Sequence, residues 1–238
     1  MKKIFFLGIT LFLIGCQKKV ELVQAVRTID STMINHTPVY IFFEIKGKDT
    51  LAEVNRKNTI GTTNWVFNID KRLPLKMVIP EIIKLQEKRR GPQMHENKEA
   101  SDYYSYMDSV QKTLAFMSFR EINYTFDNYF STIYVKDNPA YHANFQTFAV
   151  NFKLNNKVSV DGNEVDMNDL STFLKEYTEF SSPNQRILLY LNFDERLTFD
   201  QYLSKVIELK ALESEQISIS TTHFIYNLKK LPDCDCAK

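Results

Sequence analysis

Acidic side chains follow two apolar runs of the chain, where carboxylates can serve as general acids, general bases or ligand contacts. Asp70 comes directly after the run 65–69, and Asp194 comes directly after the run 187–193. Acid–base catalysis requires two such groups within reach of one substrate. A carboxylate in this position also accepts backbone hydrogen bonds in turns and helix caps, and this structural role is the more common one. We therefore treat Asp70 and Asp194 as binding candidates only and expect no catalytic residue.

The other residues with chemical potential form no recognisable site. The four histidines lack the His-x-x-x-His and His-Glu-x-x-His spacings of metal sites. Cys234 and Cys236 have no nearby histidine or third cysteine to complete tetrahedral ligation, although the two thiols can oxidise outside the cytosol. No Gly-x-Ser-x-Gly, phosphate-loop or dinucleotide-binding motif is present. These observations predict a protein without metal, cofactor or enzymatic activity.

The N-terminus has the features of an export signal. Lys2 and Lys3 precede the apolar stretch 4–14, which is followed by Gly15 and Cys16. This stretch is too short for a membrane-spanning helix, which needs about 20 residues. Leu-Ile-Gly-Cys resembles the lipobox of bacterial lipoproteins, and the resemblance implies that residues 1–15 are removed and that Cys16 is acylated. We expect a lipid-anchored protein of the bacterial cell envelope, facing the periplasm or the cell surface; a plain signal peptide is the alternative.

Composition limits the remaining possibilities. The chain has 238 residues, of which 44% are hydrophobic and 25% are charged, with a formal net charge of +1. This length accommodates one large domain or two small ones. No basic block is present, so a nucleic-acid partner is not expected.

An internal repeat relates two parts of the chain at a constant offset of 124 residues. Residues 64–88 align with residues 188–212, and each segment reads as a strand, a turn and an amphipathic helix. The alignment includes four identities around the turn: Asn68 with Asn192, Asp70 with Asp194, Arg72 with Arg196, and Leu73 with Leu197. The sequence therefore predicts two related units in which Asp70 and Asp194 are equivalent.

The elements around this repeat predict an α+β fold of two tandem two-layer units, each a small mixed sheet with helices on one face. We expect a tether at 16–36, a first unit at 37–135, a second unit at 145–226 and a tail at 227–238. Within the first unit, residues 93–117 carry apolar side chains at helical spacing and predict an inserted helix, and residues 121–126 alternate as the closing strand.

The second unit resembles the periplasmic domain of the ExbD/TolR family of biopolymer-transport proteins. The matching pieces are the segment Val158-Ser-Val-Asp-Gly-Asn-Glu-Val165 before a capped helix, the strand Leu189-Tyr-Leu-Asn-Phe-Asp194, Phe199, an amphipathic helix and a short closing strand. The resemblance covers residues 148–222 and, more faintly, 38–126. It implies a domain that dimerises, engages envelope proteins or peptidoglycan, and catalyses nothing. Two features depart from the family: Cys16 stands in place of its membrane helix with an aspartate, and residues 213–216 replace its usual Gly-Ile pair.

These observations lead to one main hypothesis and two alternatives. The main hypothesis is a lipid-anchored adaptor that binds envelope proteins or peptidoglycan, or forms a homodimer, by pairing strand edges. Residues 216–220 alternate apolar and polar side chains, so Ser218 is a candidate on such an edge. The alternatives are a lipoprotein hydrolase that uses Asp70 or Asp194 with a histidine, and a glycan-binding lipoprotein with exposed aromatic residues.

Overall fold

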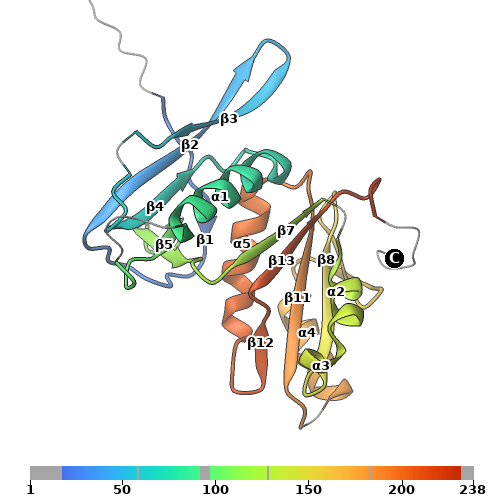
Figure 1. Cartoon of the computed structure of the whole chain (residues 1–238). Helices are drawn as coiled ribbons and strands as arrows, with labels where there is room; N and C mark the ends of the chain where they lie inside the picture. Colours follow the sequence, from blue (N-terminus) through green and yellow to red (C-terminus); the bar gives the residue numbers. More distant parts are fainter. Residues whose placement is uncertain (1–17, 58, 92–96, 128, 183, 232–238) are drawn as a thin grey trace, which may run out of the picture.

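The computed structural model describes residues 18–57, 59–91, 97–127, 129–182 and 184–231, which form two mixed β-sheets with helices (Figure 1). The predicted α+β fold in two sheet units is confirmed. The predicted signal peptide, the lipidation candidate Cys16 and the pair Cys234 and Cys236 lie outside the described residues.

The first sheet has the strand order β1-β5-β4-β2-β3, and β6 pairs with β5. Helix α1 follows β4 and buries one apolar face, although it contains Pro80. Strands β2 and β3 form a hairpin whose turn uses Gly47 with a φ of 68°, a conformation that glycine adopts without strain. The elements are β1 (Gln24–Ala25), β2 (His36–Lys46), β3 (Asp49–Asn55), β4 (Asn64–Ile69), α1 (Leu75–Arg90), β5 (Asp102–Asp108) and β6 (Leu114–Ser118).

The second sheet has the order β10-β9-β8-β11-β13-β7, and β12 also pairs with β11. Helix α5 follows β11 and begins with a capping box between Thr198 and Gln201. The elements are β7 (Asn123–Asp127), α2 (Ser131–Asp137), α3 (Pro139–His142), β8 (Gln146–Phe152), β9 (Lys157–Val160), β10 (Asn163–Asp166), α4 (Leu170–Ser181), β11 (Ile187–Asp194), α5 (Phe199–Leu209), the 3-10 helix η1 (Lys210–Leu212), β12 (Ile217–Ile219) and β13 (Thr222–Tyr226).

The two sheets share one topology. The order β1-β5-β4-β2-β3 of the first sheet corresponds to β7-β13-β11-β8-β9 of the second. In both, the central strand is parallel to its two neighbours, and the hairpin strand beyond is antiparallel. Strand β6 has no counterpart in the second unit, and β10 and α4 have none in the first. The repeat thus extends well beyond the segment in which sequence identity indicates it.

The two repeated turns pair with each other around a pseudo-twofold axis. Leu75 N–H donates to Leu197 O at 2.8 Å, and Phe199 N–H donates to Leu73 O at the same distance. The donors of the two bonds are 124 residues apart in the sequence, and so are the acceptors. A twofold-symmetric dimer interface shows the same reciprocal exchange of contacts. A second reciprocal pair flanks them: Lys76 N–H to Glu195 O at 2.8 Å and Asp200 N–H to Lys71 O at 3.0 Å.

Side-chain packing follows the same symmetry. Helix α1 contacts β7 of the second sheet, α5 contacts β1 of the first, and the two helices contact each other. One hydrophobic cluster contains buried residues from both sheets and both helices. The two units therefore form one body with a shared core, and Figure 1 shows α5 lying between the sheets.

The predicted inserted helix at 93–117 is wrong, because the described part of this segment forms strands β5 and β6. The apolar positions 103, 106, 107 and 110 match helical spacing by coincidence. Tyr104 and Tyr106 are both fully buried and stand two residues apart, as in a strand with one face in the core. Val110 is 71% exposed in the turn between the strands.

The predicted unit boundaries also need correction. Strand β7, predicted to close the first unit, pairs in parallel with β13 and so belongs to the second sheet. Residues 16–36 were predicted to be a tether, but they contain β1, with Val23 and Ala25 buried. Residues 131–135, predicted to end the first unit, lie in α2, whose residues Tyr134 and Val135 pack against Tyr190 on the face of β11 away from the shared core. The second sheet therefore has helices on both faces.

Candidate functional site

Asp70 is a structural anchor of the first repeated turn. Its side chain is fully buried and accepts hydrogen bonds from Arg72 Nε (2.8 Å), Arg72 Nη2 (2.8 Å) and the backbone N–H groups of Arg72 and Glu21. Burial raises the pKa of Asp70, but the hydrogen bonds from Arg72 and the backbone outweigh it and hold the pKa below its usual value. The carboxylate is therefore ionised and fully engaged.

Asp194 repeats this arrangement in the second turn. It is 3% exposed and accepts from Arg196 Nε at 2.9 Å, from Arg196 Nη2 at 2.6 Å and from the Arg196 backbone at 2.9 Å. The predicted equivalence of Asp70 and Asp194 thus holds in bonding detail. Both carboxylates serve their own turns, which removes the main support for the hydrolase alternative.

The histidines in the described residues are placed elsewhere. His36 starts β2 and is exposed, while the ring of His142 lies 2.6 Å from the Tyr190 hydroxyl through Nε2. His223 Nδ1 lies 2.8 Å from the Tyr202 hydroxyl, at the end of a buried chain that continues to Tyr124 (3.0 Å) and Tyr104 (2.6 Å). Burial lowers the pKa of His223 to about 3, so its ring is neutral in the folded protein near neutral pH. This chain links β5, β7, α5 and β13 as part of the packing between the units.

Ser218 was predicted to lie on a free strand edge. Its backbone is instead directed toward the neighbouring strand β11. Because N–H direction alternates along a strand, the Ser218 N–H points toward β11. On the outer side of β12, the backbone of Ile217 is already bonded to Ser214. The bonds that fix this direction are Ile187 N–H to Gln216 O and Ser220 N–H to Leu189 O, both at 2.8 Å. Strand β12 therefore offers little backbone for a partner.

A longer free edge lies on β3, the last strand of the first sheet. Asp70 N–H donates to Ile41 O at 3.0 Å, so the backbone of Ile41 faces β4. Ile41 pairs with Val54 in the antiparallel register, and Val54 must therefore direct its N–H and C=O away from β2. By the same alternation, Ala52 and Thr50 also face outward. No hydrogen bond to these three N–H groups occurs within the described residues.

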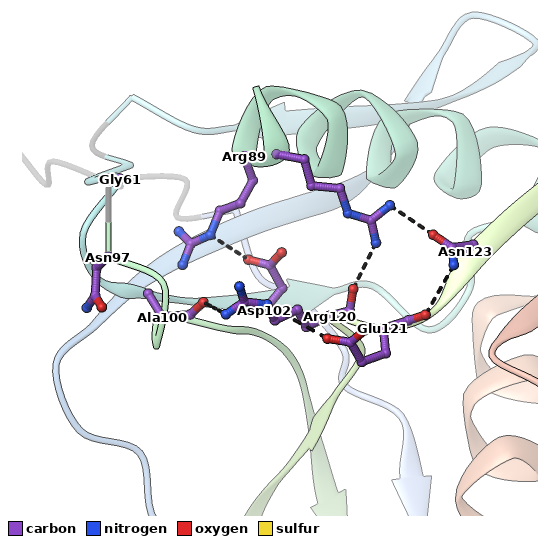
Figure 2. A pocket seen from close by; sticks show the side chains of 9 residues that line it. Gly61, Arg89, Asn97, Ala100, Asp102, Arg120, Glu121 and Asn123 are labelled. Atoms are coloured by element: carbon purple, nitrogen blue, oxygen red, sulfur yellow. Dashed lines mark hydrogen bonds and ion pairs between the residues drawn. The ribbon is translucent and has the colours of Figure 1, made fainter. Parts of the chain in front are cut away.

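A polar cavity of about 380 Å³ lies at the C-terminal end of α1 (Figure 2). Arg89 and Arg90 reach it from the last turn of α1, and Arg120 reaches it from the segment after β6. Asp102, at the start of β5, and Glu121 contribute the carboxylates, and Asn97 and Asn123 complete the polar lining. The cavity thus combines three guanidinium groups with two carboxylates.

The three guanidinium groups are held in place by the protein. Arg89 lies over the Trp65 ring, with its Cζ atom 4.7 Å from the ring centroid. The other contacts are Arg89 Nη2 to Thr63 O (2.8 Å), Arg90 Nη1 to Asn123 Oδ1 (2.9 Å), Arg90 Nη2 to Arg120 O (2.8 Å), and Arg120 Nη1 to Lys98 O and Ala100 O (both 2.6 Å).

Asp102 is the unusual member of the cavity. It is 4% exposed, and its Oδ1 lies 3.5 Å from Arg89 Nε without accepting a hydrogen bond from any described residue. Burial raises the pKa of Asp102 to about 6, although Arg89, Arg120 and Arg90 oppose the shift. Sequence spacing does not indicate this cavity, because Asp102 falls within the helix predicted at 93–117 and Arg120 stands 30 residues beyond Arg90.

Three further findings bear on function. The described residues contain no cluster of histidine, cysteine or acidic side chains suited to a metal ion. None of the helices in the described ranges is long and apolar enough to cross a membrane. No protein-family model, curated protein or solved structure matches the chain.

Proposed function

We propose that this chain is a non-catalytic adaptor of the bacterial cell envelope that binds an extended segment of a partner protein as an added strand on β3. The observation that carries the proposal is the outward direction of the Thr50, Ala52 and Val54 backbone at the end of the first sheet. An unpaired edge supplies a row of donors and acceptors for such a strand. The kinship with the ExbD/TolR family belongs to the same proposal and rests on the resemblance of residues 148–222.

The shape of the hairpin supports this reading. Strands β2 and β3 project beyond the rest of the first sheet (Figure 1). Strand β4 ends at Ile69, so Phe43 and Ile45 near the hairpin tip lie beyond its reach. Ile45 is 66% exposed and Leu51 is 38% exposed. Exposed apolar side chains beside an open edge give a partner strand both side-chain contacts and backbone contacts.

The start of the described chain contacts the same hairpin. Lys18 forms ion pairs with Glu44 at 3.4 Å and with Glu53. Cys16 is two residues away, so a lipid on this cysteine would hold the hairpin near the membrane surface. An envelope protein at that surface is therefore the expected partner.

The anchor can be tested by one substitution. Cys16→Ser removes the thiol that would be acylated, and we expect the variant to leave the membrane fraction because the lipid supplies the membrane affinity. Fractionation of cells followed by a high-salt wash measures this. A variant that sediments with membranes after the wash would show that the lipid is not the anchor.

The edge can be tested at Ala52. Ala52→Pro removes one outward donor and leaves the bonds between β2 and β3 intact, so the protein should fold while its association in the envelope weakens by about tenfold or more. Ala52→Ser keeps the N–H and serves as the matched control. Crosslinking in intact cells measures the association of each variant, and equal crosslinking of a folded Ala52→Pro variant would refute the β3 edge.

The glycan-binding alternative receives less support. The exposed aromatic residues Tyr40, Tyr141 and Phe180 come from β2, α3 and α4 respectively. Tyr40 stacks on Phe42 at 5.7 Å and Tyr141 stacks on Phe145 at 6.2 Å, but no ring contact within the described residues joins these two pairs into one continuous row.

A further inference from the structure

We propose that the cavity at the end of α1 binds a small phosphate or phosphate monoester, held by Arg89, Arg90 and Arg120 and sharing one proton with Asp102. This site is distinct from the β3 edge, and the inference does not depend on the proposed adaptor function.

The charge of the cavity favours an anion. Three guanidinium groups face two carboxylates, and the side chain of Glu121 is 82% exposed, so water screens its charge. Arg90 and Arg120 donate to carbonyl oxygens, which fix the guanidinium groups without neutralising them. Arg120 Nε also lies 3.9 Å from the carboxylate of the exposed Glu121. Guanidinium groups fixed in this way match the oxygens of phosphate.

Asp102 indicates which anion fits. A buried carboxylate oxygen without a hydrogen bond is unfavourable unless a donor approaches it. Inorganic phosphate carries an O–H group near neutral pH, and a phosphate monoester carries one below about pH 6, so either can supply this donor, whereas sulfate cannot. Sulfate should therefore bind more weakly than phosphate while Asp102 is ionised and gain affinity when Asp102 is protonated. The remaining charged groups that line the cavity are the three arginines, which stay charged throughout, and Glu121.

The volume of the cavity is consistent with such a ligand. At about 380 Å³ it lies within the range typical of small-molecule sites and exceeds what a phosphate ion alone would fill. A monoester such as glycerol 3-phosphate is therefore a useful second probe at about pH 6, where it still carries a phosphate proton. Tighter binding of the ester than of inorganic phosphate at that pH would identify an organic phosphate as the ligand class.

Calorimetric titration of the full chain at constant ionic strength tests the proposal. At about pH 8, inorganic phosphate should bind about tenfold tighter than sulfate, and sulfate should gain affinity toward about pH 5 as Asp102 takes up a proton. Arg90→Gln should weaken phosphate binding about tenfold, while Arg56→Gln, at an exposed arginine outside the cavity, should not.

Asp102→Asn tests whether protonation of Asp102 is the cause of the pH dependence of sulfate binding. The amide supplies its own donor, so the variant should bind sulfate with an affinity that no longer changes with pH. It also provides the test if Arg90→Gln fails to fold. The proposal is overturned if neither phosphate nor glycerol 3-phosphate binds with a Kd below about 10 mM, or if sulfate binding keeps its pH dependence in Asp102→Asn.

Discussion

Replacing His223 with glutamine should make the protein more resistant to acid than the wild type. The His223 pKa is about 3 in the folded state and close to 6.5 in the unfolded chain, so the folded state holds the ring neutral. The stabilisation from the neutral ring is fully present above about pH 6.5 and is lost as pH falls toward 3, at about 1.4 kcal/mol per unit. The total is about 5 kcal/mol. Glutamine cannot titrate, and its amide can still bond the Tyr202 hydroxyl.

The measurement is the free energy of unfolding of both proteins from about pH 7 to about pH 4. Their difference isolates His223, because groups such as Asp102 are common to both. Asp102 acts in the opposite sense: its raised pKa makes protonation favour the folded state between about pH 6 and its unfolded value. His36→Gln, at an exposed position, should follow the wild type. If the free energy of unfolding depends on pH in the same way in the wild type and in His223→Gln, the folded protein does not hold His223 neutral.

Phe199→Ala should lower the free energy of unfolding by about 3–5 kcal/mol. Phe199 is fully buried at the start of α5, and its ring lies 5.3 Å from that of Tyr104 in the first sheet. Its backbone N–H bonds to Leu73 in the paired turns. The substitution therefore opens a cavity at the junction between the units.

Denaturant unfolding measures this loss, and Phe180→Ala is the matched control. Phe180 is 88% exposed, so its removal should change stability by less than about 0.5 kcal/mol. Because the core is shared, Phe199→Ala should still unfold in one transition. Two separate transitions, with only one shifted, would contradict a single body.

The features that the sequence predicts correctly are local ones. The Asn-x-Asp-x-Arg-Leu turns carry their own hydrogen bonds, so the identities at Asp70 and Asp194 are enough to predict equivalent geometry. The helices α1 and α5 are also predictable, because each buries one face with a regular apolar period.

The errors arise where tertiary context decides the outcome. Residues 103–110 satisfy a helical period and a strand period together, and burial of Tyr104 and Tyr106 selects the strand. Strand β7 alternates like any edge strand, and its sequence does not specify which sheet it joins. The arginine cavity depends on three segments that meet only after folding, so spacing along the chain could not predict it.

The most direct test of the proposed adaptor function is amide hydrogen exchange in β3. In the purified protein, the outward N–H groups of Thr50, Ala52 and Val54 have no partner within the described residues and should exchange rapidly. In the lipid-anchored protein held in its native envelope, an added partner strand should slow their exchange by about tenfold or more, and Ala52→Pro should abolish the slowing in the rest of 49–55. If these amides exchange equally fast in the purified and envelope-bound protein, no strand adds to β3 and the proposed function is wrong.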